Sequence, residues 1–323
     1  MTVLALCWTA AIASAESVPE PSSADTEQVA AGVPIEGERA EELSFFRTEF
    51  RVVQGYRGGE FDWNIGVPGI DVRSELEWED LRSGLSRLEA TVLLPRRFYL
   101  RSDVQYGWIR DGENRDSDYD LPGRMAEFSR SYSETKGDYS GFSVGIGYRG
   151  SPIHFARESY VLAVVLGYAH REQNLLDRDL VQTIPASGPF PGERSKYDAR
   201  WFGPWVGVEV VGRSPLTSLI FTAGLEYHRV TYEAVADWNL RTDLAHPESF
   251  NHDARGEGII AHLGIRKDIG ERFFLDLGIE YTLFSTEEGD SRFNNADGTF
   301  DKTTLNEVNW EAFSALLGFG VRF

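Results

Sequence analysis

Apolar side chains occupy every second position at the end of the chain, from Phe313 to Phe323, and the residues between them are small or polar except for Leu316. A period of two residues places successive side chains on opposite faces of an extended strand. The same alternation recurs in four other segments, which are 98–108, 219–228, 259–266 and 273–283. From about residue 43 onward, the sequence therefore predicts an all-β fold whose strands have one apolar and one polar face.

Charged residues lie in the middle of the polar faces of these strands, as Asp103, Glu226 and Glu280 illustrate. An ionised side chain without a partner is very costly to bury in the dry core of a soluble protein. Inside a narrow barrel the same side chains can pair or be hydrated, while the apolar face contacts lipid. A closed barrel also leaves no unpaired strand edge in the membrane. The pattern predicts a transmembrane β-barrel, with a soluble β-sandwich as the alternative.

The sequence contains about ten such strands, which fits the even strand number of bacterial outer membrane barrels. They are expected at 44–57, 70–94, 97–111, 137–150, 158–176, 196–213, 217–238, 256–269, 271–286 and 306–323. Short connections alternate with long ones, such as 111–136 and 177–195, which are rich in turn-forming residues. This asymmetry predicts an antiparallel barrel with short periplasmic turns and long extracellular loops. A barrel of this size should be filled by its own side chains, which argues against a diffusion pore.

The composition excludes several classes of function. The chain has 32 Lys and Arg against 51 Asp and Glu, and its formal net charge of −19 disfavours nucleic-acid binding. The single cysteine, Cys7, lies in a segment that we expect to be removed, so no thiol site is expected in the mature chain. We predict no cofactor and no metal centre. The aromatic surplus predicts girdles at the membrane interfaces. The candidates are Tyr56, Trp63, Trp78, Tyr106, Trp108, Tyr168, Trp201, Trp205, Tyr227, Tyr281 and Trp310.

The N-terminal region differs from the rest of the chain. An apolar stretch over residues 3–15 ends in Ala13-Ser14-Ala15, which predicts a cleaved export signal peptide at 1–15, with a buried N-terminal helix as the alternative. Residues 16–42 are acidic, rich in Pro, Ala and Ser, and free of aromatic residues. This composition predicts a disordered leader. The barrel is then expected at 43–323.

Two acidic residues separated by one position are candidates for chemistry. Asp116 and Asp118 follow a predicted strand in an expected long loop, and in an extended segment their side chains point the same way. Their mutual repulsion should raise one pKa. Such a pair can position a water and act as a base, or bind a divalent cation. The alternative is an ordinary acidic surface loop.

A second set of candidates surrounds the end of the predicted strand at 217–238. It consists of Asp237-Trp238-Asn239 and the residues His246, His252 and Asp253 in the following loop. Histidine titrates near neutral pH without assistance, so these side chains are the available general bases. A solvated loop without chemistry is the alternative.

Several motifs resemble those of the omptin family of ten-stranded outer membrane barrels, which includes proteases. They are Ser74–Trp78, Gly107-Trp108, Asp116–Tyr119, Gly167-Tyr168, Gly192–Arg194, Tyr197–Arg200 and the segment from Tyr227 to Asp237. The resemblance implies an Asp pair, Asp116 and Asp118, facing an Asp-x-His motif across the barrel mouth, with a water between them. Asp237 matches the Asp of that motif, but Asn239 stands where the family has His. An amide cannot take up a proton near neutral pH, so His246 or His252 would have to replace it.

Further motifs in the expected loops are similar to the Protochlamydia-type outer membrane protein family of omptin-like barrels. They are Glu127–Ser131, Gln173–Leu175, Gln182–Pro185, Gly188–Gly192 and Tyr197–Trp201. This resemblance implies fold and location and leaves activity open. The omptin resemblance implies lipopolysaccharide contacts through Tyr168 and Arg200, although His170 and Glu172 depart from the family pattern. The C-terminal Phe323 resembles the signal read by the barrel-assembly machinery.

We therefore expect an exported outer membrane barrel of a Gram-negative bacterium. The favoured hypothesis is a barrel that is non-catalytic or of uncharacterised activity, whose extracellular loops bind a surface ligand or partner. The alternative is an omptin-type endoprotease that uses Asp116, Asp118 and Asp237, with His246 as the base. An acidic mouth suits cationic ligands and basic substrates equally.

Overall fold

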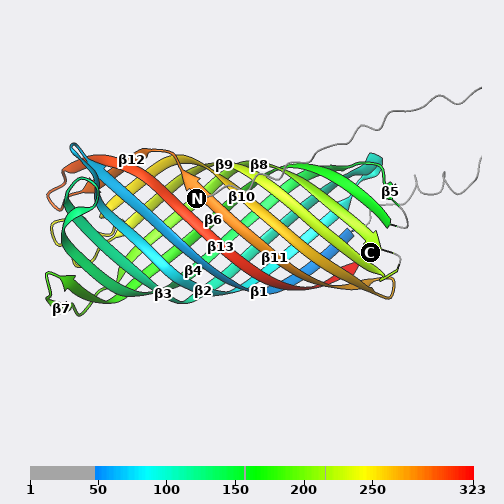
Figure 1. The fold of residues 1–323 in the computed structure, drawn as a ribbon, viewed down its shortest axis with the longest axis horizontal. Helices are drawn as coiled ribbons and strands as arrows, with labels where there is room; N and C mark the ends of the chain where they lie inside the picture. The colour runs from blue at the N-terminus through cyan, green and yellow to red at the C-terminus, as the bar shows by residue number, and fades with distance from the viewer. Residues whose placement is uncertain (1–47, 156–157, 215) are drawn as a thin grey trace, which may run out of the picture. The chain divides into compact units, whose positions relative to one another are not determined.

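The computed structural model describes residues 48–155, 158–214 and 216–323 of the chain. The predicted signal peptide at 1–15 and the predicted leader at 16–42 lie outside the described residues. Within the described part, no helix is long and apolar enough to cross a membrane. The described residues form one antiparallel sheet in which the first and last long strands also pair, so that the sheet closes into a barrel (Figure 1).

Ten long strands make the wall of the barrel. They are β1 (Thr48–Val67), β2 (Ile70–Leu93), β3 (Phe98–Leu121), β4 (Met125–Arg149), β6 (Glu158–Ile184), β8 (Ser195–Ser214), β9 (Leu219–Asp237), β10 (Phe250–Ile269), β11 (Phe273–Thr286) and β13 (Phe300–Arg322). Three short strands, β5 (Ile153–Phe155), β7 (Gly188–Pro189) and β12 (Gly289–Asn294), pair with them, and the turn η2 (Pro95–Arg97) joins β2 to β3. The predicted all-β fold and its ten antiparallel strands are confirmed.

The apolar faces of the strands point outward. On β11 and β13, Leu277 is 62% exposed and Leu317 is 54% exposed, whereas the alternate residues Asp276 and Ser314 are buried at 8% and 1%. A soluble protein would bury the two leucines and expose the aspartate and the serine. The fold therefore matches a barrel whose outer surface contacts hydrocarbon, and the soluble sandwich is excluded.

The outward residues are apolar over only part of each long strand, for example from Phe98 to Trp108 on β3, where Ser102 is the exception, and from Leu162 to Tyr168 on β6. The stretch on β3 corresponds to the ~9–11 residues that a tilted strand needs to cross the membrane, and the stretch on β6 is shorter. Beyond this apolar band, the strands continue into an extracellular extension of the barrel. Residues such as Asp116 and Asp237 belong to that extension and lie outside the membrane.

The predicted loops at 111–136 and 177–195 are therefore largely wrong. β3 and β4 continue as a ladder to a turn at Gly123, whose φ of +70° suits glycine, and β6 runs on to Ile184. The outer faces of these extensions contact water, so their sequences lack the apolar alternation that marks the lower parts of the same strands. Polar residues on both faces therefore do not exclude a strand here.

Five of the predicted girdle residues lie inside the barrel. They are Trp63, Trp78, Trp201, Trp205 and Trp310, each at most 3% exposed. For Trp78, a register shift between Glu79 and Arg82 changes which residues of β2 face inward. The other candidates, Tyr56, Tyr106, Trp108, Tyr168, Tyr227 and Tyr281, are exposed on the outer face.

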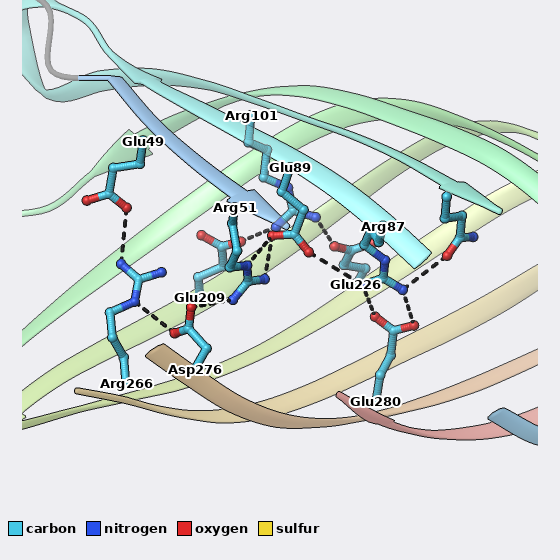
Figure 2. A network of polar contacts seen from close by, with 11 residues as sticks. Glu49, Arg51, Arg87, Glu89, Arg101, Glu209, Glu226, Arg266, Asp276 and Glu280 are labelled. Atoms are coloured by element: carbon cyan, nitrogen blue, oxygen red, sulfur yellow. Dashed lines mark hydrogen bonds and ion pairs between the residues drawn. The ribbon is translucent and has the colours of Figure 1, made fainter. Parts of the chain in front are cut away.

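The interior has a charged layer within the membrane and an aromatic layer above it. In the charged layer, Arg87 donates to both carboxylate oxygens of Glu280 at 2.8 and 2.7 Å, and Arg101 pairs with Glu209 and Glu226 (Figure 2). The aromatic layer contains stacked or tilted rings, including Phe284 against Trp310 at 5.4 Å and Trp201 against Phe284 at 5.5 Å. These side chains occupy much of the tube and leave a cavity of about 420 Å³ in the charged layer.

Candidate active site

Asp116 and Asp118 lie on one inner wall of the extracellular extension. The strand ladder places Asp116 beside Leu76 and Asp118 beside Ser74 on β2. Because alternate residues of a strand share a face, the two carboxyl groups are neighbours. The predicted common orientation of the pair is thus present, but it is set by a strand and not by a loop.

Burial raises the pKa of both carboxyl groups. For Asp116, burial comes first and the Asp118 carboxylate adds to it, so its pKa lies well above the usual range. Burial also raises the pKa of Asp118, against the opposing effect of hydroxyl groups on Ser74 and Ser129. Oδ1 of Asp116 has no hydrogen-bond partner among the described residues. A carboxyl group with a raised pKa retains its proton to higher pH and can both donate and accept it.

Asp237 and His246 form a hydrogen-bonded pair at the end of β9. Nδ1 of His246 donates to Oδ1 of Asp237 over 2.6 Å, and both side chains are partly exposed. When Nδ1 carries the proton, Nε2 has a free lone pair and can act as a base. A carboxylate that orients an imidazole in this way also stabilises its protonated form.

The connection between β9 and β10 holds His246 in this position. The Ser249 hydroxyl accepts from the Trp238 amide at 2.9 Å and donates to the Ala245 carbonyl at 3.1 Å. The Ala245 amide donates to the Asn294 carbonyl on β12 at 2.8 Å. Leu244 is also buried, at 4% exposure. These contacts fix the backbone on the N-terminal side of His246 against the barrel.

Arg241, in the same connection, is a cation that acts electrostatically on the Asp pair. Its guanidinium group is held by both oxygens of Asp243, at 2.9 and 2.7 Å. The positive charge of Arg241 also lowers the pKa of both Asp116 and Asp118, against the larger effect of burial. The segment that carries His246 therefore lies within electrostatic range of the Asp pair.

The family profile of the Protochlamydia outer membrane proteins matches residues 51–323. The chain belongs to this family. Among solved structures, the outer membrane protease OmpT from Escherichia coli is similar, with a TM-score of 0.72 and 12% sequence identity, over 87% of this chain and 99% of that chain. This likeness establishes an omptin-like barrel fold, and together with the family it places the protein in the bacterial outer membrane.

Two other solved barrels are much less similar to this family member. The translocator domain of the autotransporter NalP from Neisseria meningitidis has a TM-score of 0.38 at 12% identity, over 90% of this chain and 95% of that chain. OprG from Pseudomonas aeruginosa has a TM-score of 0.34 at 9% identity, over 85% and 95%. Neither value is high enough to support a conclusion. A comparison with curated protein sequences gives no match.

In this member of the Protochlamydia outer membrane protein family, Asn239 has a structural role. The backbone amide of Arg194 donates to Oδ1 of Asn239 at 2.8 Å, and Nδ2 of Asn239 donates to the Gly192 carbonyl at 2.8 Å. The side chain therefore ties the β9–β10 connection to the segment between β7 and β8. Both the oxygen and the nitrogen of the Asn239 amide are thus hydrogen-bonded to the backbone.

His252 and Asp253 lie on β10, so their predicted place in a loop is wrong. His252 faces inward, with Nδ1 at 2.9 Å from the Tyr197 hydroxyl, and burial lowers its pKa to about 3. The imidazole of His252 is therefore neutral at physiological pH and does not take up a proton there. Asp253 is exposed on the opposite face of the strand. Of the three loop candidates, the structure brings His246 alone to Asp237.

Asp177 is a buried acid that the sequence did not reveal. Its carboxylate accepts from Thr135 Oγ1 at 2.5 Å and from Trp78 Nε1 at 3.1 Å, and burial raises its pKa to about 7. Its charge also raises the pKa of Asp116, after the larger effects of burial and of the Asp118 carboxylate. It lies beyond the apolar band, where no alternation indicates which residues face inward.

Tyr168 and Arg200 lie on the outer face of the neighbouring strands β6 and β8, away from the inner wall. Tyr168 is 43% exposed, and Arg200 approaches Glu172 at 3.4 Å. His170 also contacts Glu172, at 2.9 Å. The lipopolysaccharide contact implied by the omptin resemblance stays a prediction.

Proposed function

We propose that this outer membrane barrel is an endopeptidase that acts at its extracellular mouth. The observation that carries the proposal is the 2.6 Å hydrogen bond between His246 and Asp237, because it supplies the general base that the Asn239 position lacks. The Asp pair on β3 supplies the second half of an omptin-like arrangement. The alternative, a barrel that binds a cationic ligand without catalysis, uses the same acidic mouth.

In this proposal, Nε2 of His246 takes a proton from the water that attacks the peptide carbonyl. Asp237 orients the imidazole and stabilises the imidazolium that forms. A proton retained by Asp116, whose pKa is raised by burial and by the Asp118 carboxylate, is available to the carbonyl oxygen or to the departing amine. A positioned proton acceptor of this kind contributes ~10²–10⁴-fold to the rate.

The charge of the site favours basic substrates. Asp116, Asp118 and Asp237 concentrate negative charge at the mouth, so peptides with lysine or arginine near the cleaved bond should associate fastest. Arg241 opposes this charge only in part, because its guanidinium group is already paired with Asp243.

The test is hydrolysis of a dibasic fluorogenic peptide by the refolded barrel, with and without lipopolysaccharide. We expect cleavage by the unaltered protein and a loss of ~10²–10⁴ in kcat/KM for His246→Ala. His154→Ala is the matched control, because His154 is an exposed histidine on β5. Undiminished cleavage by His246→Ala would overturn the mechanism. Saturable peptide binding without any hydrolysis would instead support the alternative, a barrel that binds a cationic ligand without catalysis.

Export, assembly and lipid contacts complete the proposal. We propose that the signal peptide is removed after Ala15, that the exposed C-terminal Phe323 is read by the barrel-assembly machinery, and that Tyr168 and Arg200 contact lipopolysaccharide. The mass and N-terminal sequence of the mature protein test the cleavage site. Loss of lipopolysaccharide binding by Tyr168→Ala and Arg200→Ala tests the last contact.

A further inference from the structure

The charged layer of the barrel encloses a cavity of about 420 Å³. Its wall includes Arg213 and Arg322, near the periplasmic ends of β8 and β13, and also Arg87 and Glu280 in the middle of the membrane. Phe284 and its ring partners lie above it in the aromatic layer. The cavity thus belongs to the periplasmic half of the barrel, and its size is that of a small-molecule site.

Most charged side chains around this cavity neutralise one another, as Figure 2 shows. Glu280 accepts from both Arg57 and Arg87, and Glu226 contacts both Arg101 and His228. The carboxylate oxygens of these residues are therefore already engaged. Arg51 is likewise shared between Glu89 and Asp276.

Three charged residues of the cavity wall are left over. One of them, Arg149, ends β4 on the periplasmic side, and its guanidinium carbon lies 4.7 Å from the centre of the Tyr99 ring. The other two lie deeper in the barrel and have opposite charges. Within the part of the barrel that the structure describes, Arg171 on β6 and Asp103 on β3 have no hydrogen-bond or ion-pair partner, and both line the cavity. They attract each other electrostatically, yet they do not form an ion pair. The guanidinium carbon of Arg171 lies 5.9 Å from the centre of the Phe284 ring, at the boundary with the aromatic layer.

The strand ladder explains why Arg171 and Asp103 do not meet. Arg171 pairs with Gly141 on β4, and Gly141 pairs with Gln105 on β3, so Asp103 lies one inward position further toward the periplasm and two strands away. Neighbouring strands are ~4.8 Å apart and a strand rises ~3.4 Å per residue, so the backbones of the two residues are separated by about 12 Å. Their side chains flank the same space from two sides.

We propose that this cavity is a binding site for a small zwitterion that carries a carboxylate and an ammonium group, such as an amino acid or a short peptide. The planar guanidinium fork of Arg171 suits a carboxylate, and the Asp103 carboxylate accepts hydrogen bonds from an ammonium group. A ligand with both groups neutralises both unpaired charges at once. The ligand enters from the periplasm, and the site is independent of peptide cleavage at the extracellular mouth.

The test is isothermal titration calorimetry of the full-length barrel in detergent with L-alanyl-L-alanine. N-acetyl-L-alaninamide, which has neither charge, is the matched ligand. We expect saturable binding of the dipeptide and at least tenfold weaker binding of the neutral compound. Equal affinities for the two compounds, or no binding of the dipeptide, would overturn the proposal. This result needs only the unaltered protein.

Variants then assign the two charges. Arg171→Met and Asp103→Asn should each lower the affinity for the dipeptide by about ten- to a hundredfold, the range of one charge-assisted hydrogen-bonding site. Arg213→Met is the control, because Arg213 lines the cavity but is exposed and approaches Asp268 at 3.7 Å. Unchanged affinity in both Arg171→Met and Asp103→Asn would show that the charges do not bind the ligand. Heat-modifiable migration on gels verifies that each variant is folded.

Discussion

The imidazole of His246 lies 2.6 Å from the carboxylate of Asp237, although nine positions separate the two residues. The omptin pattern would place this histidine two positions after the aspartate, within the strand end. Here a folded connection supplies it. A histidine can thus reach this aspartate from a distant position in the chain, because a side-chain contact depends on the positions of atoms and not on their spacing in the sequence.

The first prediction concerns the residue that occupies the expected histidine position. Asn239→His should not increase peptide cleavage, because the carboxylate of Asp237 already accepts a hydrogen bond from His246. It should instead loosen the segment between β7 and β8, since the amide contacts with Gly192 and Arg194 are lost. Limited proteolysis of the refolded barrel measures this, with cleavage expected near 185–195. A rise in kcat/KM would contradict this view of Asn239.

Arg241 should control the acidic side of the pH–rate profile. Its positive charge lowers the pKa of Asp116 and Asp118, so removal of that charge in Arg241→Ala should raise both pKa values further. If cleavage requires a negative charge on the pair, the acid limb of kcat/KM should then move to higher pH. Arg213→Ala, at the periplasmic end, should leave the profile unchanged. A shift to lower pH would show that Arg241 does not act on the pair.

Asp177 should make the barrel less stable as the pH rises. Burial raises the pKa of Asp177 to about 7, so the folded state keeps a proton that the unfolded chain releases near pH 4. Between pH 5 and pH 8 this group should reduce the free energy of unfolding by about 3 kcal/mol, at ~1.4 kcal/mol for each pKa unit. Asp177→Asn should lack this loss. Urea unfolding in lipid vesicles at the two pH values measures the difference, and parallel losses in both proteins would refute it.

The charged layer should contribute strongly to stability through Glu280. Glu280→Gln leaves the buried guanidinium groups of Arg57 and Arg87 without their carboxylate, which should cost about 3–5 kcal/mol. Glu287→Gln is the matched control, because it removes the exposed ion pair with Arg229, which is worth less than about 1 kcal/mol. Urea unfolding of both variants decides the point. If both variants lost similar amounts of unfolding free energy, the guanidinium groups in the charged layer would be as well hydrated as those at the surface.

The sequence alone indicated the membrane-spanning part of the fold well. Leu277 and Leu317 alternate with Asp276 and Ser314 because one face meets lipid and the other meets a polar interior, and this contrast is present in the order of residues. The same reasoning failed above the apolar band, where both faces of a strand contact polar surroundings. There the strand extensions that carry Asp116 and Asp118 looked like loops.

The tertiary structure decided the partners. No local pattern distinguishes His246 from His252, and only the folding of one connection against β12 brings the former to Asp237 and leaves the latter buried beside Tyr197. In the same way, Arg171 and Asp103 appear in the sequence as ordinary inward charges, and they are unpaired only because strand register gives the nearby carboxylates and guanidinium groups to other residues. The alternation of apolar and polar residues is a local property of a strand, whereas the contact partner of a side chain depends on distances across the whole barrel.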